Sequence, residues 1–518
     1  MVELSTIRAG EAAPHVELPR SYNAAVDLLD RHVFEGRGGK VAVIDDEGRY
    51  TYAELAARAD RAAGALAAMG VQPEQRVAIV MLDGVDVPAA FLGAIKLGAV
   101  PVLLNTMLTP EDYTYMLRDS RARVVIASAS LYAKLGPAIE ACPGVGVAIV
   151  GTGPDAPSWR LLLEAAAPIT HVAETTPDDV AFWLYSSGST GKPKGAMHLH
   201  GSLMWTAALY GQGVLDIQPD DIVYSAAKLY FAYGLGNALT FPFSVGATAV
   251  LCSERPSPAT VMRVMQEHRP TIFGGVPTLF AQLLADPSWT HDVVASLRYS
   301  ISAGEALPKH ISERWKARTG TEILDGIGST EMLHIFLSNR PGDITYGTTG
   351  RAVPGYDLEL RADDGSVLPV GSEGALWVRG PSSCTGYWGN RECTLSTFVG
   401  AWTRTGDQYL SNPDGTWTYC GRADDMLKVG GIWVSPFEVE SALASHPAVL
   451  EAAVVGHEDE HGLTKPKAFV VLRTPATADE LKLFVREKLA AFKYPRWVEL
   501  VKELPKTATG KIQRFKLR

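Results

Sequence analysis

Residues 178–200 read DDVAFWLYSSGSTGKPKGAMHLH, an apolar run typical of a strand followed by a loop of glycine, serine, threonine and lysine. Glycines permit positive φ and close backbone approach, successive backbone N–H groups form an anion-binding concavity, and hydroxyls donate further hydrogen bonds. The lysines offset phosphate charge. The stretch therefore predicts a phosphate-binding loop rather than a flexible surface turn. Its predicted contacts are Ser186, Ser187, Gly188, Ser189, Thr190, Gly191, Lys192 and Lys194.

A Walker A loop is the nearest rival for this stretch. That motif places Ser or Thr directly after its lysine, where the hydroxyl holds Mg²⁺. Here Pro193 follows Lys192, and the first glycine of the motif is replaced by Ser186. The sequence thus disfavours a P-loop ATPase.

The rest of the chain fits a large globular enzyme. It has 518 residues, 47% hydrophobic and 20% charged, so two or three domains are expected. A net charge of −9 argues against a nucleic-acid binder. No run is long enough to span a bilayer, and the five scattered cysteines form neither a disulfide framework nor a zinc motif. We therefore expect a cytoplasmic location and no membrane partner.

Apolar strand-like runs alternate with helical patterns through the first third of the chain, beginning at VAVID (41), VAIVML (77) and PVLLN (101). This rhythm predicts a parallel α/β sheet, and it recurs from about residue 179 to 325. Turn-rich sequence then indicates a β-rich subdomain, and a small α+β unit follows Gly421. The expected fold class is α/β, with two sheets and a β-rich subdomain in the N-terminal part.

Six segments in one order resemble the acyl-adenylate-forming superfamily, which includes acyl-CoA synthetases, luciferases and peptide-synthetase adenylation domains. They are YSSGSTGKPKG (185), SAGEALP (302), DGIGSTE (325), TRTGD (403), GRADDMLKVGG (421) and PKTATGK (505). The resemblance implies an N-terminal adenylation domain, 1–421, and a small mobile C-terminal domain, 422–518. It also implies a reaction in which a carboxylate and ATP give acyl-AMP and pyrophosphate, with Mg²⁺ neutralising phosphoryl charge.

The resemblance assigns roles to single residues. Thr190 and its loop would hold the β and γ phosphates, and Thr330 and Glu331 would lie by the α-phosphate, with Glu331 placing the metal. Lys511 would bridge the carboxylate and α-phosphate. The remaining nucleotide contacts would be Gly304, Glu305, Ala306 and Asp325 at the adenine, and Asp407 and Arg422 at the ribose. Glu331 has the alternative of capping a helix, because Ser329 and Thr330 precede it.

The second half-reaction brings a thiol to the acyl-adenylate, and the resembling enzymes rotate the small domain for it. Asp424 matches the usual hinge position, with Lys428 as a less favoured candidate, and Gly430 and Gly431 would line the pantetheine channel. Phe492, Lys493 and Arg496 would contact the CoA nucleotide, or else form an ordinary helix end. CoA is favoured as acceptor because only seven residues follow Lys511; a stand-alone adenylation domain serving a carrier protein is the alternative.

The stretches AAKLYFAYGLGNALTF (226) and DGIGSTEMLHIFLSN (325) resemble those of benzoate–CoA ligases. By that resemblance an apolar slot for a ring would be lined by Ala232, Tyr233, Phe241, Gly328, His334 and Ile335. Tyr230, Phe231 and Phe336 read equally well as core, and His200 as structural. His334 would meet a ring substituent such as hydroxyl or amino, so benzoate, 4-hydroxybenzoate and 2-aminobenzoate all stay open.

These features predict an ATP-dependent aromatic acid–CoA ligase whose partners are small molecules, and they leave a homodimer open. A nucleotide-sensing module without catalysis would be expected to lack Lys511, Glu331 or Thr190, and all three are present. A P-loop hydrolase would form ADP without any acid, so the reaction products separate the hypotheses.

Overall fold

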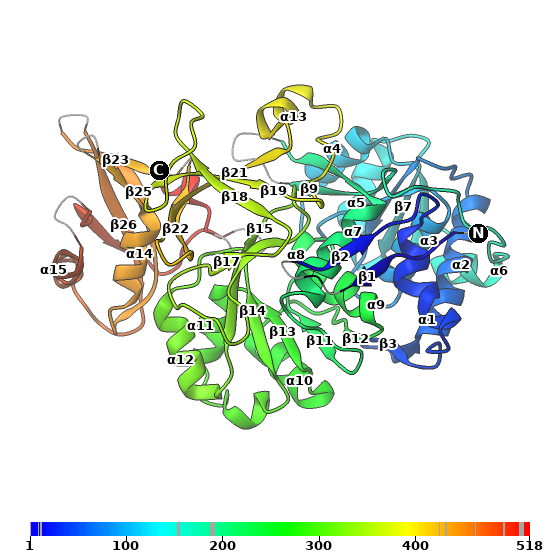
Figure 1. The fold of residues 1–518 in the computed structure, drawn as a ribbon, viewed down its shortest axis with the longest axis horizontal. Helices are drawn as coiled ribbons and strands as arrows, with labels where there is room; N and C mark the ends of the chain where they lie inside the picture. The colour runs from blue at the N-terminus through cyan, green and yellow to red at the C-terminus, as the bar shows by residue number, and fades with distance from the viewer. Residues whose placement is uncertain are drawn as a thin grey trace.

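The computed structural model describes residues 2–8, 10, 13–152, 156–186, 192–423, 425–429, 432–460, 463–489, 493–506 and 512–518. Its architecture is mixed α/β, with a large N-terminal part and a small C-terminal part (Figure 1). Among the described helices, none is long and apolar enough to cross a membrane.

The first sheet of the large part has the strand order β10-β9-β6-β5-β7-β8, and its strands are parallel except for the β9–β10 hairpin. Its central strands are continuous apolar runs because helices cover both faces. The strands are β5 (Arg76–Val80), β6 (Val100–Leu103), β7 (Val124–Ser128), β8 (Gly146–Val150), β9 (Val180–Ser186) and β10 (Lys194–Leu199).

The second sheet has the order β17-β16-β15-β14-β13-β11-β12-β3-β4, with parallel strands in the centre and antiparallel strands at both ends. The strands are β3 (Val41–Ile44), β4 (Arg49–Thr51), β11 (Ile222–Ser225), β12 (Thr248–Val250), β13 (Ile272–Gly275), β14 (Tyr299–Ser302), β15 (Ile323–Gly328), β16 (Ile335–Ser338) and β17 (Arg351–Ala352).

The strand assignment corrects the interpretation of the first third as one sheet. The strand at 41 pairs with β12 in the second sheet, whereas the strand at 180 pairs with β6 in the first. Each strand exists where the local pattern predicts it. The predicted pairing of these strands in one sheet is wrong. Each strand pairs with residues more than 70 positions away, and local periodicity does not encode such distant contacts.

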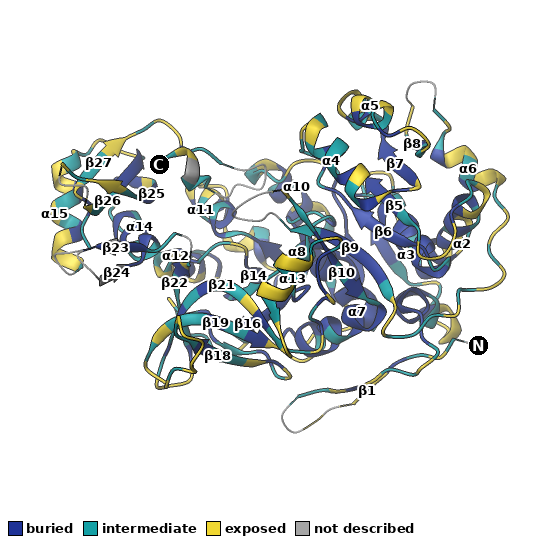
Figure 2. Ribbon diagram, turned by 90° about the horizontal axis from the view of Figure 1, so that it is seen from above, coloured by how far each residue is buried: buried dark blue, intermediate teal, exposed yellow. Residues whose placement is uncertain are grey.

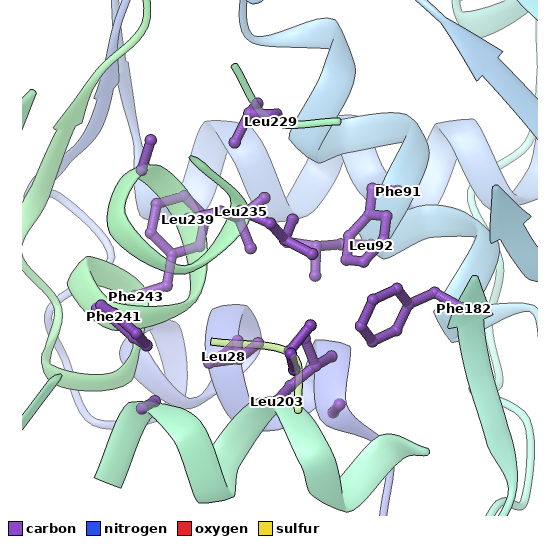
Figure 3. Packing of buried hydrophobic residues seen from close by; sticks show 14 of the residues in the cluster. Leu28, Phe91, Leu92, Phe182, Leu203, Leu229, Leu235, Leu239, Phe241 and Phe243 are labelled. Atoms are coloured by element: carbon purple, nitrogen blue, oxygen red, sulfur yellow. The ribbon is translucent and has the colours of Figure 1, made fainter. Parts of the chain in front are cut away.

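Helices fill the space between the two sheets and cover their outer faces (Figures 1 and 2). In Figure 3 leucines and phenylalanines of α3, α7, β9 and the segment 235–243 meet in the shared core. The helices are α1 (Arg31–Phe34), α2 (Tyr52–Ala68), α3 (Asp86–Lys96), α4 (Pro110–Ser120), α5 (Tyr132–Glu140), α6 (Trp159–Ala165), α7 (His200–Thr206), α8 (Ala232–Leu235), α9 (Phe241–Val245), α10 (Pro258–His268), α11 (Pro277–Ala285) and α12 (Lys309–Thr319).

Short helical turns and a terminal hairpin complete the large part. The segment η4 is a π-helix between α8 and α9, a type of turn that is often found at functional sites. These elements are β1 (Thr6–Arg8), β2 (His15–Glu17), the π-helices η1 (Val26–Asp30), η3 (Ala207–Gln212) and η4 (Gly236–Thr240), and the 3₁₀ turns η2 (Ala129–Leu131) and η5 (His291–Val294).

Three helix starts follow from local sequence. Thr51 and Thr477 each form a reciprocal capping box with the glutamate three residues later, and Thr109 forms one with Asp112. Each box satisfies backbone N–H groups that the first helical turn leaves without partners. These helix boundaries are therefore written in the sequence itself.

The β-rich subdomain has strand order β18-β19-β21-β20, with β22 paired to β21, and it leads into the small part. Apolar residues of the small part form their own core clusters. The elements are β18 (Asp357–Arg361), β19 (Glu373–Arg379), α13 (Arg391–Thr397), β20 (Phe398–Val399), β21 (Trp402–Ser411), β22 (Trp417–Arg422), β23 (Leu427–Val429), β24 (Ile432–Val434), α14 (Pro436–Ala444), β25 (Val449–Glu458), β26 (Thr464–Leu472), α15 (Ala478–Lys488), β27 (Trp497–Leu500) and η6 (Arg514–Lys516).

Candidate active site

The carboxyl ends of β14 and β15 bring the predicted adenine contacts together. These strands are parallel, with Ser302 opposite Asp325, and Gly304 to Ala306 follow directly after β14. Gly304 has φ +88°, a conformation that a glycine adopts at little cost. Ligands of open α/β sheets bind at such strand ends. The parallel pairing of β14 and β15 therefore brings Asp325 close to the 304–306 segment.

The Asp325 carboxyl has one buried oxygen that is not used. Its Oδ1 accepts no hydrogen bond from any residue of the described ranges, and burial raises the pKa of the group well above its usual value. A buried acceptor without a partner is costly, so a ligand N–H donor at this point would be stabilising. Glu305 is held differently, because its Oε2 accepts from the Thr278 hydroxyl at 2.8 Å.

Thr330 and Glu331 lie on a turn between β15 and β16. Residues outside the turn donate hydrogen bonds to its backbone carbonyls. The Thr330 carbonyl is 2.7 Å from Nε2 of His198, and the Glu331 carbonyl accepts from the backbone N–H of Cys384 at 2.8 Å. Burial lowers the pKa of His198 to about 4, so the ring is neutral and donates from Nε2. The Glu331 carboxylate accepts from the Tyr387 hydroxyl at 2.8 Å. No helix begins at this turn, so the capping alternative for Glu331 is wrong.

Asp407 and Arg422, the predicted ribose contacts, face each other across β21 and β22. They are paired in register, and an Arg422 Nη lies 3.1 Å from an Asp407 oxygen. Gly406 precedes Asp407 at φ +78°, and a side chain there would meet the Arg422 guanidinium at 2.8 Å. The close approach of these two charged groups thus requires glycine at 406.

The predicted phosphate loop is the connection between β9 and β10. Ser186 ends β9, Lys194 begins β10 directly opposite it, and residues 187–191 lie outside the described residues. The ammonium groups of Lys192 and Lys194 lie 5.0 and 4.4 Å from the ring centroids of Tyr115 and Tyr387. Aromatic faces attract cations at such distances, so both lysines are oriented by neighbouring rings.

The predicted acid pocket is centred on His334. Its ring lies 4.4 Å from that of Phe241, 5.4 Å from Tyr210 and 5.6 Å from Tyr233, and Nε2 is 3.2 Å from the Tyr233 carbonyl. Burial lowers the pKa of His334 to about 3, and Nδ1 has no partner in the described part of the chain. The predicted pocket residues therefore surround a neutral imidazole with one nitrogen that lacks a hydrogen-bond partner among the described residues.

Small residues bring the pocket walls together. Gly328 is paired with Ile335 across β15 and β16, and a Cβ on Gly328 would lie 2.3 Å from the His334 carbonyl. Ala232 begins α8, directly before Tyr233. The Tyr233 hydroxyl lies 2.9 Å from the Ile301 carbonyl at the end of β14, which ties the pocket wall to the second sheet.

Neighbouring aromatic and histidine residues are structural. Phe336 is fully buried, and Tyr230 packs against the core and edge-on to Phe231 at 4.5 Å. His200 accepts from the backbone N–H of Ala24 at 3.1 Å, and burial lowers its pKa to about 4. The structural interpretation of His200 is confirmed.

Several predicted residues of the small part lie outside the described residues, namely Asp424, Gly430, Gly431, Phe492 and Lys511. Lys493 forms an ion pair with Glu438 at 2.7 Å, and Arg496 is exposed. Helix α15 ends at Lys488. Lys493 and Arg496 therefore do not form a helix end.

A divalent cation would find few protein ligands here. The described residues contain no group of three or more His, Cys, Asp or Glu side chains placed to hold a metal. Mg²⁺ is commonly bound by one or two carboxylates together with substrate phosphates and water. The single Glu331 carboxylate, which Tyr387 links to Lys194, fits that mode.

Two residues that contact the site were not predicted from the sequence. Tyr387 contacts Glu331, and Gly236 lies under His334, where a Cβ would be 2.2 Å from Cδ2 of the ring. Neither has a local signal, because the first contact joins positions 56 residues apart and the second almost 100. An aromatic after Gly386 and a glycine within a helical run are ordinary features of any core.

The chain is similar to AMP-binding enzymes over most of its length. The family profile described as AMP-binding enzyme matches residues 29–388, and that of the AMP-binding enzyme C-terminal domain matches 438–511. A benzoate–CoA ligase of Thauera aromatica is 54% identical, with 100% of both chains covered. A 4-hydroxybenzoate–CoA/benzoate–CoA ligase of Rhodopseudomonas palustris is 49% identical, over 96% of this chain and 94% of that one.

A crystal structure of a benzoate CoA ligase from Burkholderia xenovorans superposes with a TM-score of 0.91 at 53% identity, covering 96% of this chain and 100% of that one. An anthranilate CoA ligase in complex with anthranoyl-AMP gives 0.93 at 41% identity, covering 97% of each chain. Sequence, fold and the ordered site segments agree, and the chain belongs to the family of AMP-binding enzymes.

Proposed function

We propose that the protein is an AMP-forming aromatic acid–CoA ligase whose preferred acid is benzoate. An oxygen of the benzoate carboxylate attacks the α-phosphorus of ATP, and the bond to the pyrophosphate oxygen breaks. The CoA sulfur then bonds to the carbonyl carbon of benzoyl-AMP. AMP leaves with the electron pair of the C–O bond, and the thiol proton passes to solvent.

The observation that carries the proposal is the cluster of aromatic rings around His334. This cluster adjoins β15, the strand that carries Asp325 three residues before Gly328, so the proposed nucleotide and acid contacts lie about 10 Å apart along one strand. That spacing is on the scale of an aryl group joined to a nucleotide. The names of the most similar relatives support benzoate as the acid.

The proposal gives each site residue a role. The phosphate loop, Ser186 to Lys194, holds the β and γ phosphates, and Asp325 accepts from the adenine amino group beside the 304–306 segment. Asp407 and Arg422 hold the ribose. Thr330 donates to the α-phosphate, and Glu331 binds Mg²⁺, which supplies positive charge against the phosphoryl oxygens.

In this proposal the chain divides at 421/422, and the small domain supplies Lys511 for adenylation. It then rotates about Asp424, so that Gly430 and Gly431 line the pantetheine channel. The C-terminal profile match, which ends at residue 511, supports a common function for this unit. The cytoplasmic location and a homodimer stay predictions.

The test is acid-dependent exchange of labelled pyrophosphate into ATP, with benzoate, 4-hydroxybenzoate, 2-aminobenzoate and acetate as substrates. We expect exchange with benzoate alone and thioester only after CoA is added, with AMP and pyrophosphate as products. Absence of exchange with every aryl acid would overturn the proposal. Formation of ADP without any acid would instead indicate a P-loop type of hydrolysis.

A second candidate acid is 4-hydroxybenzoate, and the unpartnered Nδ1 of His334 favours it. A neutral imidazole nitrogen accepts a hydrogen bond from a phenol, which benzoate does not offer. The ratio of kcat/KM for the two acids decides between them. If kcat/KM is lower for benzoate than for 4-hydroxybenzoate, the hydroxylated acid is the preferred substrate.

A further inference from the structure

The segment 384–388 lies between the phosphate loop and the turn that carries Glu331. It reaches β10 through a backbone bridge between Tyr387 and Ala196, and Trp388 donates to the Gly195 carbonyl at 2.8 Å. On its other side the backbone N–H of Cys384 holds the Glu331 carbonyl. One short segment is thus bonded to both halves of the proposed phosphate and metal site.

Tyr387 is the side chain in this segment that reaches both halves. It is only 5% exposed, and its hydroxyl donates to Oε1 of Glu331 at 2.8 Å. Its ring faces Lys194, whose ammonium lies 4.4 Å from the ring centroid. The residue therefore contacts the carboxylate proposed to bind the metal and a lysine proposed to face the phosphates.

The hydrogen bond fixes which carboxylate oxygen is available. A tyrosine hydroxyl donates and an ionised carboxylate only accepts, so the direction of the bond from Tyr387 to Glu331 is fixed. It uses Oε1, and within the described ranges no hydrogen bond or ion pair uses Oε2. An ionised carboxylate has about four lone-pair positions, so Oε2 keeps its full capacity for a cation.

We propose that Tyr387 is a positioning residue for adenylation. It orients the Glu331 carboxylate toward the bound magnesium–ATP and fixes the position of this carboxylate relative to Lys194. This inference rests on the proposed function, because it takes Glu331 as the metal carboxylate. It adds a residue that none of the predicted motifs contains.

A purely structural Tyr387 is the competing explanation, since the ring packs with Ala196, Cys384 and Phe398. The two explanations differ in what loss of the hydroxyl changes. A structural role predicts lower stability with unaltered metal dependence. A positioning role predicts a higher Mg²⁺ requirement at unchanged KM for benzoate.

The experiment is a Mg²⁺ titration of benzoate-dependent pyrophosphate exchange in Tyr387→Phe, which removes only the hydroxyl and keeps the ring. We expect the Mg²⁺ concentration for half-maximal rate to rise about 10-fold, because a hydrogen bond to a charged group is lost. The KM for benzoate stays within about 2-fold. Should the phenylalanine variant fold poorly, Tyr387→Met, whose flexible apolar side chain adapts to an irregular space, is measured instead.

Tyr346→Phe is the matched control, because its hydroxyl donates to Glu322 at 2.6 Å in an equivalent tyrosine–glutamate pair at the opposite end of β15. It should leave the Mg²⁺ requirement unchanged. In a Glu331→Gln background, Tyr387→Phe should add nothing further, since the oriented group is absent.

The outcomes separate the two levels of the hypothesis. If Glu331→Gln raises the Mg²⁺ requirement and Tyr387→Phe does not, the positioning role is overturned and the proposed function stands. If Glu331→Gln leaves the Mg²⁺ requirement unchanged, the metal role of Glu331 in the proposed function is itself wrong. An equal rise in Tyr346→Phe would also overturn the inference.

Discussion

At the scale of single residues, the site depends on positions where a side chain would not fit. Gly236, in the π-helix η4, is one of these, because a Cβ would lie 2.6 Å from His334 Nε2 and 2.9 Å from Phe241 Cζ. The absent side chain lets His334 pack edge-on to Phe241 while its Nε2 reaches the Tyr233 carbonyl. Glycine at 236 thus determines the position of the imidazole.

Gly236→Ala should therefore displace His334. We expect the KM for benzoate to rise about 10-fold or more and the free energy of unfolding to fall by about 1–3 kcal/mol, the usual cost of overpacking a core. Exchange kinetics and urea unfolding measure the two effects. Gly136→Ala is the control, because a Cβ added to Gly136 within α5 would meet no neighbouring side-chain atom closer than 3.9 Å. This variant should leave KM unchanged. An unaltered KM in Gly236→Ala would contradict this view of the pocket.

At the scale of elements, one buried ion pair network joins three helices. Lys96, at the end of α3, is 1% exposed, and its ammonium lies 2.7 Å from Asp30 of η1 and 2.6 Å from Asp60 of α2. Burial raises the pKa of Asp30 and outweighs the opposing effect of Lys96. These ion pairs connect helices that pack between the two sheets. We therefore expect them to stabilise the packing of the two sheets against each other.

Lys96→Met should leave two facing carboxylates without their cation and lower the free energy of unfolding by about 3–5 kcal/mol at pH 8. Without Lys96 the folded-state pKa of Asp30 lies still higher, so the folded variant takes up a proton more readily than the unfolded chain. The loss should therefore shrink as the pH falls from 8 toward 5.

Urea unfolding at the two pH values measures this effect. Lys309→Met is the control, because Lys309 is 62% exposed and 3.7 Å from Glu313, and its change should stay within about 0.5 kcal/mol. A loss below about 1 kcal/mol in Lys96→Met at pH 8 would show that the network contributes little.

At the scale of the whole molecule, the proposed site draws on both parts of the chain. The pocket, the turn at Glu331 and the Asp407–Arg422 pair belong to elements up to β22, whereas Lys511 belongs to the small part. A lysine delivered by a separate unit can serve one half-reaction and be withdrawn for the next. The two steps should then respond differently to its loss.

Lys511→Ala should lower benzoate-dependent pyrophosphate exchange by about 100-fold or more, the scale of losing one group that stabilises developing charge. Thioester formation from preformed benzoyl-AMP and CoA should stay within about 3-fold. Lys506→Ala, which breaks the 2.6 Å pair with Glu451, is the control and should preserve both steps. Equal loss of both half-reactions in Lys511→Ala would refute its assignment to adenylation.

The sequence by itself determined the elements and the order of the site segments. Capping boxes at Thr51 and Thr477, apolar strand runs and the YSSGSTGKPKG loop are local signals, because each depends on residues within a few positions of one another. Family resemblance supplied the prediction that Asp325, Glu331, Asp407 and His334 belong to one site. In the structure Asp325 lies on β15, and His334 directly precedes β16, the strand that pairs with β15.

Only the tertiary structure decided which sheet each strand joins and what surrounds each site residue. The strand at Val41 belongs to the second sheet, Tyr387 meets Glu331, and Gly236 lies under His334. Each of these contacts joins positions at least 56 residues apart. Their energy comes from hydrophobic burial and side-chain packing that exist only once the chain is compact, so no local pattern records them.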